Sequence, residues 1–264
     1  MLEFAKKLAK RAGKLALGYY EKGVNYTQKS DATDLVTEAD IAVNNFIVKE
    51  VKKKYPDHGI VSEEDKKDHN GGAKFVWVID PIDGTRNFAK HIPFWCVMIG
   101  LEKDGLPHIG VIYDALHDEM FFAEIGRGAF CNNKKMFVSR REDISVSFMS
   151  FCPGVNQSSS PYSSGKLFDY KRFFNNIVND KGHWLHHWGC MLEACYAAAG
   201  RIDALVKDGI LYHDCLMPYV IAKEAGATVT DSTGKEWRKG MKDMVIANPK
   251  LHKKLLKLFY DKKI

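Results

Sequence analysis

Two aspartates and a threonine follow a short apolar stretch, in the order Asp80-Pro81-Ile82-Asp83-Gly84-Thr85. The stretch before them, residues 75–79, reads Phe-Val-Trp-Val-Ile and predicts a buried strand. Asp80 and Asp83 flank the backbone carbonyl of Ile82, so one turn offers three oxygen donors of the kind that Mg²⁺ or Mn²⁺ prefers. Free backbone N–H groups after Gly84 can bind phosphate. The pattern therefore predicts a metal site beside a phosphate site, although Asp-Pro and Asp-Gly are also typical of an ordinary turn.

Acidic residues recur at three other places where a helix or strand is predicted to begin or end: residues 34–40, residues 63–65 and Asp214. Glu63 follows the predicted strand 59–61 as Asp80 follows its own strand, so the two acids lie side by side if these strands are neighbours. Such packing of negative charge requires a cation, because like charges raise each other's pKa and cost stability. Alone, the acids at 63–65 are typical of a solvated turn, and Asp214 of a helix N-cap.

In order along the chain, these segments resemble the inositol monophosphatase family of Mg²⁺-dependent, lithium-sensitive phosphomonoesterases. The resemblance rests on residues 34–40 (Asp-Leu-Val-Thr-Glu-Ala-Asp), 62–64 (Ser-Glu-Glu), 80–85, 189–200, 213–214 (His-Asp) and 224–226 (Glu-Ala-Gly). The set spans nearly the whole chain and is more specific than the turn at 80–85 alone. It implies the layered α/β fold, an αβαβα sandwich, that the family shares with fructose-1,6-bisphosphatases.

The resemblance assigns expected roles to the matching positions. Glu63, Asp80 and the Ile82 carbonyl would hold one metal ion, and Asp80, Asp83 and Asp214 a second. A third, weaker ion could lie near Glu63, so two or three Mg²⁺ ions are expected, with Mn²⁺ as a possible substitute. Thr85, linked to Asp40, would orient and deprotonate the attacking water, and Glu63 completes the expected catalytic group. Two close ions suit this reaction, because they activate water and stabilise the departing oxygen without a covalent enzyme intermediate.

The same resemblance places the substrate and a neighbouring loop. Expected substrate contacts are Asp83, Gly84, Thr85, Gly189, Cys190, Lys207 and Asp214. Lys29 matches the lysine of the family's mobile N-terminal loop. The substrate is expected to be a small phosphorylated metabolite, with inositol 1-phosphate as the family's usual case.

Lys207 departs from the family pattern most consequentially, because inositol-specific members carry an acidic residue there. A carboxylate accepts hydrogen bonds from a polyol, whereas an ammonium donates hydrogen bonds and attracts anions. Fructose 1,6-bisphosphate, histidinol phosphate and adenosine 3′,5′-bisphosphate therefore stay open as alternatives, as does a lysine that extends into solvent and contacts nothing. The aromatic segment 183–188 either lines the leaving-group pocket or packs the interior.

Two smaller departures are Ser62, where the family usually has Gly, and His213, where it usually has Trp. Ser62 is expected to alter the turn and not the chemistry. His213 is expected to exchange one packed aromatic ring for another, with metal ligation as the alternative. A second class of function is a regulatory or RNA-associated protein that keeps the fold and acts through a partner.

Composition sets broader limits. A chain of 264 residues with 45% hydrophobic content can bury a core large enough to fold without disulfides or a structural metal. Its six cysteines form no CxxC pair, so neither a zinc finger nor a disulfide framework is indicated. Lys+Arg 39 against Asp+Glu 33 gives 39 − 33 = +6, a mild excess that suits an anionic small substrate and makes nucleic-acid binding unlikely to be the main function. No apolar run approaches the ~20 residues that span a bilayer, so a cytoplasmic location is expected. The resemblance also implies that the protein forms a homodimer.

The elements that must position these residues follow from periodicity. Helices are predicted at 2–22, from about 34–40 to 54, at 167–178, 188–199 and 214–225, and after Pro249; strands at 59–61, 75–79, 95–101, 108–113, 120–123, 202–206, 228–230 and 244–247. Residues 25–33 and 152–166 are predicted loops. The best boundary divides residues 1–150, with the metal motifs and the larger sheet, from residues 151–264, with the last metal ligand, as halves of one compact catalytic unit.

Overall fold

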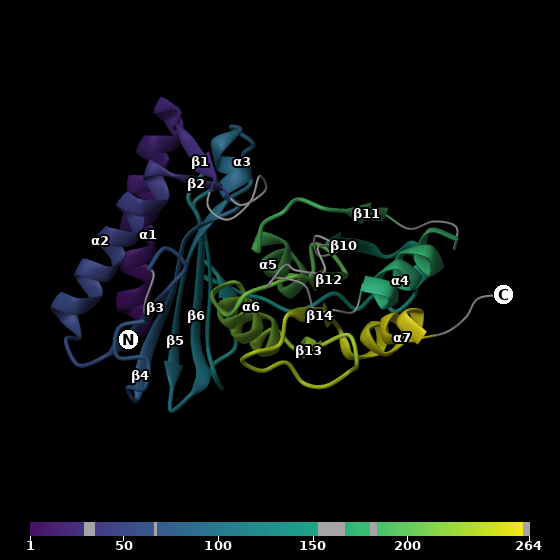
Figure 1. Ribbon diagram of the computed structural model, residues 1–264. Helices are drawn as coiled ribbons and strands as arrows, with labels where there is room; N and C mark the ends of the chain where they lie inside the picture. Colours follow the sequence, from purple (N-terminus) through teal and green to yellow (C-terminus); the bar gives the residue numbers. More distant parts are fainter. Residues whose placement is uncertain (29–34, 66–67, 153–166, 180–183, 261–264) are drawn as a thin grey trace.

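The computed structural model describes residues 1–28, 35–65, 68–152, 167–179 and 184–260 (Figure 1). The larger sheet has seven strands in the spatial order of the sequence: β3 (Gly59–Ser62), β4 (Phe75–Asp83), β5 (Cys96–Lys103), β6 (Leu106–Asp114), β7 (Glu119–Glu124), β8 (Ala129–Cys131) and β9 (Lys134–Lys135). Only β3 and β4 are parallel within it, and the other neighbours are antiparallel. From β5 onward the larger sheet is therefore a series of antiparallel hairpins.

The smaller sheet has the order β11-β10-β12-β14-β13. Its strands are β10 (Phe148–Cys152), β11 (Trp184–His186), β12 (Ala204–Asp208), β13 (Thr228–Thr230) and β14 (Asp243–Ala247). The strand β10 runs parallel to both β11 and β12, while β14 runs antiparallel to β12 and β13. A hairpin of β1 (Tyr26–Gln28) and β2 (Leu35–Thr37) stands apart from both sheets.

Helices cover and separate the sheets in layers (Figure 1). They are α1 (Leu2–Lys22), α2 (Glu38–Lys54), the short α3 (Thr85–Ala89), α4 (Leu167–Asn179), α5 (Leu192–Ala198), α6 (Tyr212–Glu224) and α7 (Pro249–Tyr260), with a 3₁₀ turn at Ile144–Val146. The pair α1 and α2 covers the outer face of the larger sheet, α5 and α6 lie between the sheets, and α4 and α7 cover the smaller sheet. This is the predicted αβαβα sandwich.

Three apolar cores match these layers. Ile47 of α2 packs with Ile79 in the outer core, Leu216 of α6 lies with Ile246 between the sheets, and Phe173 meets Phe259 under α4 and α7. Burying such side chains supplies the main driving force for folding, at roughly 25 cal/mol per Å² of apolar surface. The amphipathic pattern in the sequence therefore corresponds to one buried face on each helix.

Helix α6 approaches the larger sheet more closely than a side chain at Gly110 would allow. A Cβ atom added to Gly110 would lie 2.7 Å from the carbonyl oxygen of Met217. Glycine is needed there for close backbone approach. The consequence is that the first turn of α6, with Asp214, lies near the carboxyl end of β4, where Asp80 interacts electrostatically with it.

Several predicted boundaries are wrong. Residues 26–28 form strand β1 and not a loop. They pair with β2 at three positions, which is too short a strand to show a pattern in the sequence. The helix expected at 188–199 begins at Leu192, because residues 188–191 are not helical, with Gly189 at a φ of 68° and Met191 as the N-cap. Helix α6 begins at Tyr212, so Asp214 lies inside its first turn and not at the N-cap.

Some predictions fall outside the described residues. They include Lys29 and Asp34, and nearly all of the connection at 152–166. The division of the chain at residue 150 also stays a prediction. No helix in the described part of the chain is both long and apolar enough to cross a membrane.

Candidate functional site

The parallel pair β3 and β4 brings two acids to the same edge of the larger sheet. Ser62 pairs with Ile79, and the N–H of Glu63 donates to the Ile79 carbonyl at 3.1 Å. Glu63 and Asp80 are therefore the next residues on neighbouring parallel strands, and their carboxyl groups share a hydrogen bond. The predicted side-by-side placement of these acids is confirmed.

Asp80 is the electrostatic centre of this edge. Its side chain is buried, and its Oδ1 atom has no hydrogen-bond partner among the described residues. Burial raises the pKa of Asp80 well above its ordinary value, and the nearby charges of Glu63, Asp83 and Asp214 raise it further. Leaving a buried carboxylate oxygen unpaired among like charges is costly. A divalent cation would remove both costs, so this donor set fits the metal that the sequence predicts.

Asp83 lies one irregular turn beyond Asp80, where the register between β4 and β5 shifts. Its Oδ2 atom accepts the backbone N–H of Met191 in a short hydrogen bond, which ties the segment before α5 to the end of β4. Burial raises the pKa of Asp83 to about 6, although Lys207 lowers it and Asp214 raises it. Asp83 thus joins the two halves of the chain at the acidic edge.

Asp214 contributes from the opposite half. Its Oδ2 atom accepts a hydrogen bond from the Leu211 N–H at 2.8 Å. Asp214, in the first turn of α6, thus provides an acceptor for the N–H of the residue that precedes the helix. His213 Nε2 lies 3.5 Å from Asp214 Oδ1. The imidazole therefore contacts a predicted metal ligand, and the expectation that His213 only replaces a packed ring is incomplete.

Thr85 and Asp40 meet beside this cluster. The Thr85 hydroxyl lies 3.2 Å from Asp40 Oδ1 and 3.0 Å from the Ile82 carbonyl oxygen. Asp40 is fully buried, and its Oδ2 atom accepts the N–H of Thr37 at 2.7 Å and the Thr37 hydroxyl at 2.5 Å. Thr37 and Asp40 form the capping box of α2, which fixes the carboxylate toward Thr85. Thr37 is not among the predicted site residues, yet its spacing from Asp40 is the signal of such a box.

Gly84 allows the chain to turn sharply from β4 into α3. Its φ of 87° favours glycine, and an added Cβ would lie 3.1 Å from the Phe94 carbonyl oxygen and 3.2 Å from Cys190 Cβ. Asn87 then donates to the carbonyl oxygens of Phe94 and Trp188, both at 2.7 Å. The turn at 80–85 and the segment at 188–191 are therefore held against each other.

A second group of charged residues lies beside Asp83, on the side of the smaller sheet. Lys207, on β12, interacts electrostatically with Asp83, Glu193 and Asp214. Burial alone lowers the pKa of Lys207, but Cys152 and these three acids raise it above its ordinary value. The alternative in which Lys207 extends into solvent and contacts nothing is therefore wrong.

Two further bases lie near Lys207. Burial lowers the pKa of His187, and the positive charges of Lys207 and Arg86 lower it further. Arg86 directly follows the turn at 80–85 and is exposed on α3. Their charges gather at one place, although nothing in their sequence spacing predicts it.

The described part of the aromatic segment, residues 184–188, lies near the surface, with Trp184 and His187 exposed and the other three residues partly buried. His186 stacks on Phe148 and Trp188, with ring centroids 4.2 and 4.8 Å apart. Glu193, which is fully buried on α5, accepts the Trp188 N–H, while its Oε2 atom has no partner in the described part of the chain. Among the described residues of this segment, His187 interacts electrostatically with Lys207.

The remaining predicted residues differ in exposure. Gly189 has a φ of 68° and open space around it, whereas the Cys190 side chain is fully buried. Any substrate contact by Cys190 therefore involves its backbone. The Ser62 hydroxyl donates to Asn44 Oδ1 at 2.7 Å, which braces the end of β3 without entering the acidic cluster.

Comparison with known proteins agrees with this arrangement. The model of the family described as "Inositol monophosphatase family" matches residues 1–263. The protein "Nus factor SuhB" of Pasteurella multocida is 31% identical, over 97% of this chain and 94% of its own length. The protein "Fructose-1,6-bisphosphatase/inositol-1-monophosphatase" of Thermotoga maritima is also 31% identical, over 97% of this chain and 94% of its own.

A solved structure of the extragenic suppressor protein suhB from Bartonella henselae has the same fold. It superposes with a TM-score of 0.87 at 28% identity and covers 97% of both chains. Together with the family match over nearly every residue, the acidic edge, the Thr85–Asp40 pair and the αβαβα layers lead to one conclusion. The chain belongs to the inositol monophosphatase family.

Proposed function

We propose that this protein is a Mg²⁺-dependent phosphomonoesterase that hydrolyses a small phosphorylated metabolite by attack of water on phosphorus. The observation that carries the proposal is the buried Asp80, whose unpaired oxygen lies among three other carboxylates. A divalent cation would neutralise the charge repulsion within such a cluster, and every predicted ligand position holds a competent oxygen donor. Membership of the family supports the phosphatase class.

The protein's residues divide the work between metal binding and proton transfer. Glu63, Asp80 and the Ile82 carbonyl would hold one ion, and Asp80, Asp83 and Asp214 a second. When bound, the ions supply charge neutralisation of the phosphate, a more acidic water and stabilisation of the departing oxygen.

Thr85 and Asp40 account for the proton. With its hydrogen directed to Asp40 Oδ1, at 3.2 Å, the Thr85 oxygen presents its lone pairs to a water and aligns it. As the water attacks, its proton passes to Thr85 and the hydroxyl proton passes to Asp40. Thr37 keeps Asp40 in place during this transfer, and first-turn N–H groups after Gly84 bind phosphate oxygens.

The leaving-group side favours an anionic substrate. Lys207 places positive charge near Asp83, at the position where inositol-specific members carry an acid, and Arg86 adds a second positive charge near His187. A second phosphate or a carboxylate suits this surface better than a neutral polyol. Inositol 1-phosphate stays the family default, and fructose 1,6-bisphosphate, histidinol phosphate and adenosine 3′,5′-bisphosphate are the alternatives.

A regulatory role is the second candidate function. It is favoured by relatives that carry the name "Nus factor SuhB". The complete set of metal-ligand positions favours catalysis, since a protein acting only through a partner has no need of them. Lithium sensitivity, a homodimer, a cytoplasmic location and the absence of a nucleic-acid partner stay expectations.

The substrate is tested by a phosphate-release screen in Mg²⁺ with inositol 1-phosphate, fructose 1,6-bisphosphate, histidinol phosphate and adenosine 3′,5′-bisphosphate. We expect a substrate with a second anionic group to rank first. In Lys207→Glu, the kcat/KM ratio of that substrate to inositol 1-phosphate should fall by about 10- to 100-fold, the range of one charged hydrogen bond.

The matched control is Lys103→Glu, which changes the same charge at an exposed residue at the end of β5. The order in which Lys103→Glu prefers the four substrates should equal that of the native chain. If Lys207→Glu also leaves the ranking unchanged, Lys207 does not select the substrate, whereas failure of all four substrates would count against the phosphatase itself.

A further inference from the structure

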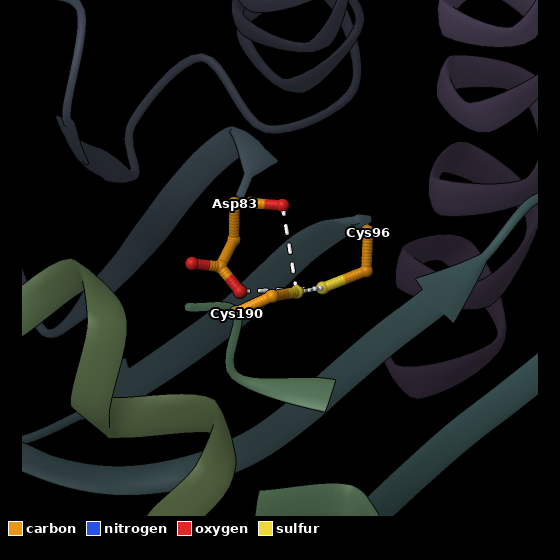
Figure 2. Close-up of side chains that lie close together, drawn as sticks. All are labelled: Asp83, Cys96 and Cys190. Atoms are coloured by element: carbon orange, nitrogen blue, oxygen red, sulfur yellow. Dashed lines mark hydrogen bonds between the residues drawn. The ribbon is translucent and has the colours of Figure 1, made fainter. Parts of the chain in front are cut away.

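Two buried cysteines, Cys96 and Cys190, lie against Asp83 (Figure 2). Cys96 is the cross-strand partner of Asp83 at the start of β5, and Cys190 precedes α5. The Cys96 sulfur lies 3.6 Å from Asp83 Oδ2 and 3.7 Å from the Cys190 sulfur. Residues far apart in sequence thus bring two thiols and one carboxylate oxygen within 4.8 Å of one another.

These spacings match those of ligands around a tetrahedral zinc ion. Bonds of about 2.3 Å to sulfur and about 2.0 Å to oxygen place two sulfurs about 3.8 Å apart and a sulfur and an oxygen about 3.5 Å apart. The two measured distances, 3.7 and 3.6 Å, lie within about 0.1 Å of these values. A disulfide is a different geometry, since its sulfurs approach to about 2.05 Å.

The three ligands are held on rigid elements and are reached through Asp83. Cys96, the first residue of β5, lies in the core between the two sheets, and Cys190 directly precedes Met191, whose N–H donates to Asp83. Asp83 itself is only partly buried, and its second oxygen points away from the sulfurs (Figure 2). Asp83 is therefore the one member of the trio that is partly accessible to solvent.

We propose that Asp83, Cys96 and Cys190 form a site for a thiophilic divalent cation of the zinc and cadmium class, which inhibits the enzyme by taking over Asp83. Binding forms metal–sulfur bonds, and each thiol releases its proton to solvent. Soft sulfur ligands select such ions over Mg²⁺, which prefers oxygen. The inhibition rests on the proposed function through Asp83, whereas the binding does not.

Binding is measured by titrating Cd²⁺ into the reduced, full-length protein in saturating Mg²⁺ and following the ultraviolet charge-transfer band of cadmium–thiolate bonds. The oxygen ligands of the Mg²⁺ site cannot produce this band. We expect it in the native chain, and an apparent Cd²⁺ affinity at least about tenfold weaker in Cys96→Ala and in Cys190→Ala, since each removes a ligand. Cys195→Ala is the matched control, because Cys195 is equally buried in the same core and is not part of the trio.

The outcomes separate this site from the proposed reaction. The absence of the band in the native chain, or its persistence at native affinity in both variants, overturns the proposal. Each variant is first compared with the native chain by thermal unfolding, and either variant that folds is sufficient. In the activity arm, Zn²⁺ inhibition relative to each variant's own zinc-free rate should require at least about tenfold more Zn²⁺ in Cys96→Ala. Equal inhibition overturns the inhibitory role, and a band without any phosphatase activity supports the site while refuting the proposed function.

Discussion

Replacing Asp83 with Asn is expected to lower Mg²⁺-dependent phosphate release by about 10³-fold or more. In such reactions, metal ions stabilise the charge of the transition state by several kcal/mol, and each 1.36 kcal/mol is about a tenfold change in rate. Asn keeps the shape of the side chain and an oxygen that can accept the Met191 N–H. The variant should therefore fold and lose only the anionic ligand.

Unfolding measurements separate this loss from damage to the fold. Without metal, Asp83→Asn should be at least as stable as the native chain, because it removes one negative charge from beside Asp80 and Asp214. Asp104→Asn, at an exposed turn between β5 and β6, is the matched control and should keep full activity. Robust turnover by Asp83→Asn would rule out the proposed site.

Removing the Thr85 hydroxyl is expected to lower kcat by about 10²- to 10⁴-fold, the usual contribution of a positioned proton acceptor. In Thr85→Ala, nothing links the attacking water to Asp40, although the carboxylate remains held by Thr37. Mg²⁺ affinity should change little, because the carboxylates of the cluster are untouched.

Thr85→Ser tests the same hydroxyl without its methyl group. It should restore kcat to within about tenfold of the native value, since Ser can donate to Asp40 and accept from water in the same way. If Ser and Ala variants are equally slow, Thr85 supports the shape of the turn and not the proton transfer. If both are equally fast, the water is oriented by other groups.

Long periodic elements and the acidic edge could be predicted from the sequence. The helix at 2–22 and the buried run before Asp80 have patterns of one dominant period. The pairing of Glu63 with Asp80 follows because both residues end their strands and these strands are parallel neighbours. In these cases, local pattern and tertiary contact point to the same arrangement.

Most three-residue strands could not be predicted, because three residues are too few to show a period; β13, predicted at 228–230, is an exception. Strand β1 is polar and exists through its pairing with β2, and strand β11 exists through its pairing with β10. The misplacement of Asp214 has a related cause. An aspartate is favourable both at the N-cap and inside the first turn, so its type does not decide between them.

Contacts between distant segments were also beyond sequence reasoning. Glu193, Arg86 and Cys96 each have an ordinary local interpretation, as a helix residue, a surface base and a core thiol. Glu193 comes near Lys207, and Arg86 near His187, where the segment at 188–191 is tied to the end of β4, whereas Cys96 meets Asp83 through the pairing of β4 with β5. The reaction class is thus more legible in the sequence than the substrate, which depends on such contacts.

The central claim is that the carboxylate cluster around Asp80 binds Mg²⁺ for phosphate-ester hydrolysis. Its most direct test is a Mg²⁺ titration of phosphate release by the native chain after complete removal of metal with a chelator. We predict no release above background without metal and saturable recovery as Mg²⁺ is added. Full activity in the metal-free protein would contradict the claim.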